Sequence, residues 1–335
     1  VSFYDAEFKD EATFFGTIFK DNADFRYSTF GKRALFGLAE FGRNANFGNG
    51  KFDDEANLGS KFGHRASFKD ATFGNGAGFT PTLGAGADLS NASFRKPRVF
   101  RPKLTAPAKL LGIVVEGPAS LRIKASDPEW TPYADEAKPG DLDLTLARFS
   151  DRVTIRGSGR LCLADVTFIE PSSVTSIEDQ IAITSLSATN CELLTLQDCD
   201  LSICQLRGAI RLAGIGLDGD TKFNLTKGVR TRRKVIAEQS PAENSRDGET
   251  GENSAIAHAQ LEGTYKSLRK ALENSGDYPA ASDFYYGQML YRLKRAKGAE
   301  RIIMEAYRTF GGFGVRAWRP FCWLVLLIIA SAVMF

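Results

Sequence analysis

The chain has 335 residues, enough for two domains of ordinary size, and its 43 Lys+Arg nearly balance its 40 Asp+Glu. That balance gives no support to a chain-wide nucleic-acid binder or to an acidic DNA mimic, and 43% hydrophobic residues excludes general disorder. Five scattered cysteines exclude a disulfide scaffold and suit a reducing compartment.

A periodic pattern of large apolar residues fills the first 100 positions. Phe or Leu recurs in alternating steps of five and six residues, a small residue usually stands two places earlier, and the register slips by one at Phe62. Steps of this length would wind around a helix, so they favour short strands joined by turns, with four sides to a coil and Phe in the interior. We expect the glycines after Phe (Gly42, Gly48, Gly59, Gly63 and Gly74) to supply turn conformations. The predicted repeat core begins with Phe3 and includes Phe8, Phe14, Phe19, Phe25, Phe30, Phe36, Phe41, Phe47, Phe52 and Leu58.

The repeated units are Ala-Asp-Phe-Arg-Tyr at 23–27, Ala-Asn-Leu-Gly-Ser at 56–60 and Ala-Asp-Leu-Ser-Asn at 87–91. They resemble the pentapeptide-repeat family, which implies a right-handed quadrilateral β-helix over 1–100. The sixth residue in every second step departs from the family pattern and implies a bulge on alternate sides.

Residues 101–228 read as a degenerate continuation of the same β-helix. Leu142, Leu144 and Leu146 alternate as in a strand, and a loop is expected at 127–141. Five-residue steps return at Leu186, Cys191, Leu196, Leu201 and Leu206, with Cys199 and Cys204 at small inward positions. We interpret these two thiols as interior residues, and a metal pair is the alternative.

Residues 229–254 combine a basic cluster with a polar segment. The cluster is Arg230, Arg232, Arg233 and Lys234, interpreted as a solvated surface with a phosphate or lipid contact as the alternative. The segment 237–254 contains no aromatic residue and reads as a linker or mobile loop.

Helical periodicity begins near residue 255 and predicts a helical adaptor over 255–312. Gly276 ends the first helix, Asp277 and Pro279 open the second, and a third follows Gly298. The segment resembles the one that joins pentapeptide repeats to a membrane anchor in a group of bacterial membrane proteins, some of which carry a two-helix ion-channel module after it. The adaptor motif comprises Tyr265, Leu268, Arg269, Asp277, Ala281, Phe284, Tyr285 and Tyr286.

The last segment, 313–335, ends in an apolar run in which only Ser331 is polar between 321 and 335. It is shorter than the roughly 20 residues of a spanning helix, and because the chain begins at Val1 and stops inside this run, we expect a fragment with a truncated transmembrane helix. A buried core helix is the alternative. Trp318, Trp323, Arg316 and Arg319 suit a membrane interface, and the predicted membrane-proximal basic residues are Arg292, Lys294, Arg295, Lys297 and Arg301.

No catalytic constellation is legible, since His64 and His258 have no evident Cys or Ser partner. We therefore expect no enzyme activity, cofactor or metal, and no nucleic-acid partner. The leading hypothesis is a membrane-anchored scaffold whose cytoplasmic β-helix mediates protein interaction or sensing, with the lipid bilayer and an unidentified protein as partners. The alternatives are the cytoplasmic domain and first transmembrane helix of an ion-channel-like protein and, with less support, a DNA-mimic topoisomerase inhibitor.

Overall fold

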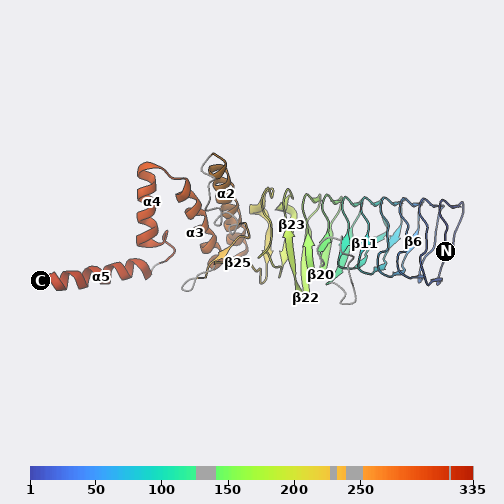
Figure 1. Ribbon diagram of the computed structural model, residues 1–335, viewed down its shortest axis with the longest axis horizontal. Coiled ribbons are helices and arrows are strands. Elements are labelled where there is room, and N and C mark those ends of the chain that lie inside the picture. The colour runs from blue at the N-terminus through green and yellow to red at the C-terminus, as the bar shows by residue number, and fades with distance from the viewer. Residues whose placement is uncertain (126–140, 227–231, 239–251, 317, 335) are drawn as a thin grey trace. The chain divides into compact units, whose positions relative to one another are not determined.

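The computed structural model describes residues 1–125, 141–226, 232–238, 252–316 and 318–334 (Figure 1). The chain divides into two compact units, unit 1 from Val1 to Phe223 and unit 2 from Asn224 to Phe335. The predicted loop at 127–141 falls outside the described residues except for its last position, as do Arg230 and residues 239–251 of the predicted linker.

Unit 1 is a parallel β-solenoid of about 9 turns, which confirms the predicted β-solenoid class (Figure 1). Successive coils pair Phe8 with Phe30 at a separation of 22 residues, and Phe52 with Phe73 at a separation of 21. The predicted register slip is the missing residue, since the coil that pairs Phe41 with Phe62 is the first to shorten. Each short strand finds its hydrogen-bonding partners one coil away, so no strand depends on a neighbour in the sequence.

Each regular coil has four sides, named here by their first inward residue: side 1 (Phe3), side 2 (Phe8), side 3 (Phe14) and side 4 (Phe19). Side 2 stacks β1 (Glu7–Phe8), β3 (Thr29–Phe30), β5 (Lys51–Phe52), β8 (Thr72–Phe73), β12 (Ser93–Phe94), β16 (Val114–Val115), β19 (Arg148–Phe149) and β21 (Thr167–Phe168). Side 4 stacks β2 (Ile18–Phe19), β4 (Glu40–Phe41), β7 (Lys61–Phe62), β10 (Thr82–Leu83) and β14 (Lys103–Thr105). Side 3 includes β6 (Asn57–Leu58), β9 (Gly78–Phe79) and β13 (Val99–Phe100), and side 1 includes β11 (Ala87–Asp88), β15 (Ala108–Lys109) and β18 (Asp141–Asp143).

The later coils merge neighbouring sides into longer strands. β17 (Ala119–Lys124) pairs with both β13 and β14, so it spans sides 3 and 4. β20 (Val153–Cys162) and β22 (Ser172–Ser185) follow, with an irregularity between Gly157 and Gly159, and β23 (Leu194–Gln197) and β24 (Gly216–Asp218) complete the sheet. Two 3-10 turns, η1 (Cys191–Leu193) and η2 (Leu212–Gly214), lie in the last coils.

The predicted repeat core is stacked as columns of aromatic rings. Phe25 lies 4.7 Å from both Phe3 and Phe47, and Phe30 lies 4.7 Å from Phe52, all with nearly parallel ring planes. These separations match the spacing of about 4.8 Å between paired strands, so one ring per coil continues each column. Nine of the ten predicted core residues from Phe8 to Leu58 are fully or mostly buried, and Phe8 in the first coil is half-buried.

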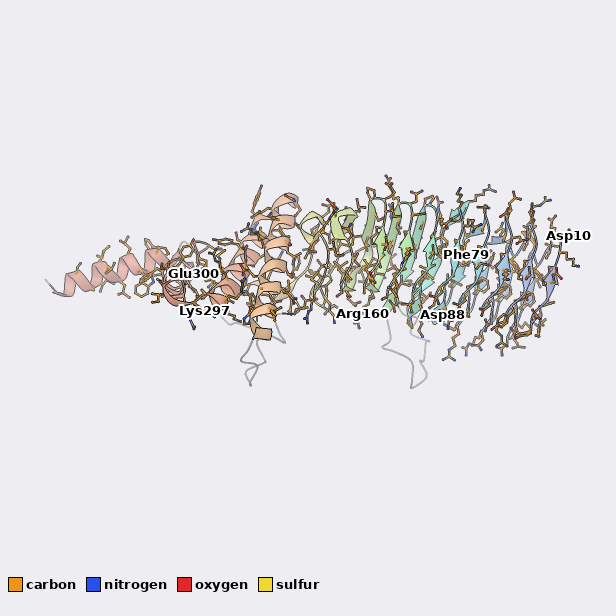
Figure 2. The ribbon with its side chains drawn as sticks, turned by 90° about the horizontal axis from the view of Figure 1, so that it is seen from above. Asp10, Phe79, Asp88, Arg160, Lys297 and Glu300 are labelled. Atoms are coloured by element: carbon orange, nitrogen blue, oxygen red, sulfur yellow. The ribbon has the colours of Figure 1, made fainter. Side chains whose placement is uncertain are left out.

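The polar residue before the large one has a definite role at each corner. Asp24, Asn46 and Asp88 each accept a hydrogen bond from the backbone N–H two residues later, at 3.1, 2.9 and 2.9 Å (Asp88 is labelled in Figure 2). Such a side chain satisfies a donor where the chain turns away from the sheet, which explains Asp, Asn, Ser or Thr at this position.

The predicted role of the glycines after Phe is wrong. None of Gly42, Gly48, Gly59, Gly63 and Gly74 has a positive φ, and the left-handed corners are mostly occupied by non-glycine residues such as Asn49 and Asp70. At Gly42 an added Cβ would lie 2.2 Å from the carbonyl oxygen of Lys20 on the preceding coil, so close approach of the backbones is what requires glycine there. Leu146 is also misassigned: it lies at a left-handed corner and is exposed, two places after the buried Leu144.

Unit 2 contains the antiparallel pair β25 (Asn224–Leu225) and β26 (Lys234–Val235) and, among the described residues, four helices. These are α2 (Glu252–Ser275), α3 (Tyr278–Arg295), α4 (Gly298–Gly311) and α5 (Trp318–Met334), close to the predicted boundaries. Asp277 caps α3 by accepting a hydrogen bond from the Ala280 N–H at 3.0 Å, and Gly312 ends α4 in a left-handed conformation. Among the described helices, none has both the length and the apolar character needed to cross a membrane.

Candidate functional site

The adaptor motif forms the interface between α2 and α3. Tyr265, Leu268 and Phe284 are fully buried, and the Tyr265 ring lies 5.5 Å from that of Phe284. Gly287 makes room for it, because a Cβ there would lie 2.4 Å from the Tyr265 ring. Ala281 is buried, and the Arg269 guanidinium lies 5.5 Å from the centre of the Tyr285 ring. The motif therefore serves packing within unit 2.

The basic cluster before the linker is brought onto α3. Arg233 is only 6% exposed, and its guanidinium lies 4.6 Å from the centre of the Tyr286 ring. The backbone N–H of Lys234 donates to Asp283 at 2.9 Å. Burial raises the pKa of the Asp283 carboxyl, although this hydrogen bond and nearby cations oppose the shift. The interpretation of Arg233 as a solvated residue is therefore wrong, whereas Arg232 is exposed.

The membrane-proximal basic residues lie at the end of α3 and the start of α4. Arg292 forms an ion pair with Glu300 at 3.2 Å, and Arg295 forms one with Glu262. Lys294 lies 4.8 Å from the centre of the Tyr291 ring. Lys297 and Arg301 are exposed, and Lys297 and Glu300 are labelled in Figure 2. Part of the predicted positive charge is thus neutralised by neighbouring carboxylates.

An exposed apolar surface is the most unusual feature of unit 2. In α4 only Met304 is buried against α3, whereas Ile302 and Ile303 are 72% and 68% exposed and Phe310 is also exposed. In α5 every large apolar side chain from 321 to 329 is at least 37% exposed. A helix that is apolar all round is expected inside a protein core or a membrane, so these helices present a surface that water does not favour. We call the exposed apolar side chains of α4 and α5 the apolar helical surface.

A second surface runs along side 4 of the solenoid. One outward residue from each coil is paired in register with the next, in the order Ile18, Glu40, Lys61, Thr82, Lys103, Arg122, Arg156, Thr175, Gln197 and Asp218. We call Lys103, Arg122 and Arg156 the basic ladder. All three are exposed, and none belongs to an ion pair recorded among the described residues of unit 1. In contrast, Glu40 and Lys61 in the same column pair at 3.0 Å.

The sequence interpretation missed the basic ladder, although a signal was present. Residues 95–124 contain eight Lys and Arg and a single acidic residue, Glu116. The chain-wide charge balance concealed this local excess.

The two candidate metal-binding cysteines are interior residues. Cys199 and Cys204 are fully buried, and the Cys199 thiol lies 3.4 Å from the carbonyl oxygen of Gln197. Burial raises the pKa of Cys199 to about 11 and that of Cys191 to about 12, so both remain protonated at neutral pH. Within the described parts of the chain, no three His, Cys, Asp or Glu side chains are placed to hold a metal ion.

The two histidines lie in different units. His64 follows β7 and is half-buried. His258 lies on α2, 5.8 Å from the Tyr291 ring, and desolvation, with smaller effects of Lys294 and Arg295, lowers its pKa.

Comparison of the chain with family models, curated proteins and solved structures found no match.

Proposed function

We propose that this protein is a membrane-attached scaffold in which the apolar helical surface enters the lipid bilayer and the β-solenoid offers binding surfaces beside it. The observation that carries this proposal is the exposure of nearly the whole apolar side of α4 and of α5. Full burial of one Leu, Ile or Phe side chain is worth about 1.5–3 kcal/mol. A bilayer therefore stabilises these helices far more than water can.

The sequence around α5 supports insertion at a membrane interface. Trp318 and Arg319 stand at its first turn, and the Arg319 guanidinium donates to the carbonyl oxygen of Arg308 at 2.8 Å. Trp and Arg are enriched where a helix enters the headgroup region. α4 has apolar side chains on one face and Arg301 and Arg308 on the other, as expected of a helix lying in the interface plane. The proposal needs α5 to enter the hydrocarbon region and does not need it to cross.

The charge distribution supports a cytoplasmic location for the solenoid in a bacterial cell. From 278 to 320 there are eight Lys and Arg against three Asp and Glu. Such an excess next to a membrane segment favours the cytoplasmic side and the anionic leaflet there. The resemblance of units such as 23–27 to pentapeptide repeats supports the same assignment, with a right-handed quadrilateral β-helix as the scaffold.

Binding, not catalysis, is the proposed role of the solenoid. The thiols of Cys191 and Cys199 are buried and protonated, and the outward polar residues such as Asp88 support the corners of the coils. A parallel solenoid presents regularly spaced side chains on each side, which suits a protein partner.

The test is flotation of the full chain with phosphatidylcholine vesicles, using an insertion-impaired variant. That variant carries Ile303→Gln, Phe310→Gln, Leu326→Gln and Ile329→Gln, all at exposed helical positions. We expect the unaltered chain to float with the vesicles and to resist high salt, because apolar burial holds it, and the variant to remain in the aqueous fraction.

A matched control replaces two exposed isoleucines of the solenoid, Ile169→Gln and Ile210→Gln, and should float like the unaltered chain. An unaltered chain that stays in the aqueous fraction would refute membrane attachment. Protease added to inside-out bacterial vesicles should digest the solenoid, and protection there would contradict the cytoplasmic location.

A further inference from the structure

The basic ladder concentrates like charges in a way that costs stability. Lys103, Arg122 and Arg156 stand opposite one another on three consecutive coils, about 4.8 Å apart at the backbone. Like charges directly opposite on neighbouring strands are destabilising. Two further exposed cations flank them: Arg101, two residues before Lys103, and Lys124, at the end of β17. Five cations thus share one side of the solenoid.

The side chains around the ladder narrow the class of partner. Above and below it in the same column stand Thr82 and Thr175, and Thr105 pairs with Lys124. Specific protein interfaces need a buried apolar or aromatic centre, and the column from Thr82 to Thr175 contains only Thr, Lys and Arg. Binding of single-stranded nucleic acid uses aromatic side chains for base stacking, and the column offers none.

The arrangement of the cations suits a planar array of negative charges. The outward side chains of β14, β17 and β20 project from consecutive strands of one parallel sheet, so their charged groups form a patch and not a groove. A duplex is convex and meets such a patch along a narrow line, whereas the headgroups of a leaflet can meet all five cations together. The observations therefore favour a lipid surface over a nucleic acid.

We propose that the basic ladder binds the anionic headgroups of a lipid leaflet. The lipid assignment rests on the proposed membrane attachment, which brings the chain to a leaflet, but the ladder acts by charge whereas α4 and α5 act by apolar burial. One basic residue near an anionic surface strengthens binding about 5-fold. Removing the three cations of the ladder should therefore weaken it about 100-fold.

The test isolates the ladder in the insertion-impaired chain defined above, so that apolar insertion does not mask it. Binding is measured at low salt to vesicles of phosphatidylcholine alone and of phosphatidylcholine mixed with phosphatidylserine. A ladder variant adds Lys103→Glu, Arg122→Glu and Arg156→Glu. A control of equal charge adds Lys51→Glu, Arg95→Glu and Arg148→Glu, three exposed residues of side 2. Far-UV circular dichroism checks that all variants retain the solenoid.

We expect the insertion-impaired chain to bind only the phosphatidylserine vesicles and to be released by salt. The ladder variant should bind at least about 100-fold more weakly, and the side 2 control should lose only a few-fold. Equal losses in the two variants would show that net charge alone acts and would overturn the proposal, as would no binding by the insertion-impaired chain. Ladder-dependent binding to duplex DNA without binding to vesicles would reassign the site to nucleic acid. Flotation of the unaltered chain with neutral vesicles depends on α4 and α5 only, so the two proposals can fail separately.

Discussion

Replacing Phe47 by Ala should lower the free energy of unfolding by about 4 kcal/mol. Phe47 is fully buried, and its ring stacks on Phe25 at 4.7 Å and on Phe68 at 5.1 Å. Three further rings meet it edge to face at 5.4–5.9 Å. Substitutions of this kind cost about 3–5 kcal/mol, as lost transfer free energy plus the cavity left behind. The estimate lies inside that range because backbone ladders hold the coils above and below apart, so the cavity cannot collapse.

A conservative substitution at the same position separates volume from ring stacking. Leu89 and Leu110 occupy later coils of the same side and are fully buried, so Phe47→Leu is compatible with the backbone. It retains most of the apolar volume and loses the stacked pairs, each worth about 0.5–1.5 kcal/mol. We therefore expect Phe47→Leu to cost about 2 kcal/mol.

The assay is urea unfolding of the full chain, followed by far-UV circular dichroism. Phe15→Ala is the matched control, because Phe15 lies on the outside of the first coil and is 62% exposed. Its cost should be within about 0.5 kcal/mol. Equal midpoints for Phe47→Ala and Phe15→Ala would refute the stacked ring column as the source of stability.

Three other substitutions test different features. Gly42→Ala should lower the urea midpoint by the equivalent of about 2 kcal/mol, because its Cβ meets the next backbone, whereas Gly263→Ala on exposed α2 should raise it by about 1 kcal/mol; the reverse order would contradict the close-approach role. Arg122→Glu should raise stability by about 0.5 kcal/mol at low salt and Glu40→Lys should lower it similarly, and the two effects should disappear in high salt. Burial raises the pKa of Asp283 above its ordinary 3.8, so the stability contributed by its neutral form is present below that pH and is lost as pH rises through the folded pKa. Asp283→Asn should remove that part of the pH dependence of the melting temperature, and an unchanged profile would show that Asp283 is not its source.

Local sequence patterns were sufficient for the fold class. The Ala-x-Phe unit predicts one inward pair per side, and the alternating steps of five and six residues require corners at regular intervals. In the helical part, Asp277, Pro279 and Gly276 placed the helix boundaries because caps depend on residues within one turn. The missing residue before Phe62 was also legible, since each coil must match the one before it.

The exposed apolar helices were foreseen as a membrane segment from composition, but α4 was not. Its periodicity predicts an amphipathic helix, and which face packs on α3 depends on tertiary contacts. The structure buries Met304 and leaves Ile302 and Ile303 outside, so the larger apolar face is the exposed one.

By itself, the sequence determined the column of inward rings, because steric fit inside each coil is set within one repeat. Only the tertiary structure decided what lies on the outside. Lys103, Arg122 and Arg156 are separated by 19 and 34 residues, so no constant period relates them, and only the pairing of β14, β17 and β20 aligns them. The same holds for Gly42, whose role depends on a backbone 22 residues away, since contacts between coils are decided by stacking and not by local preference.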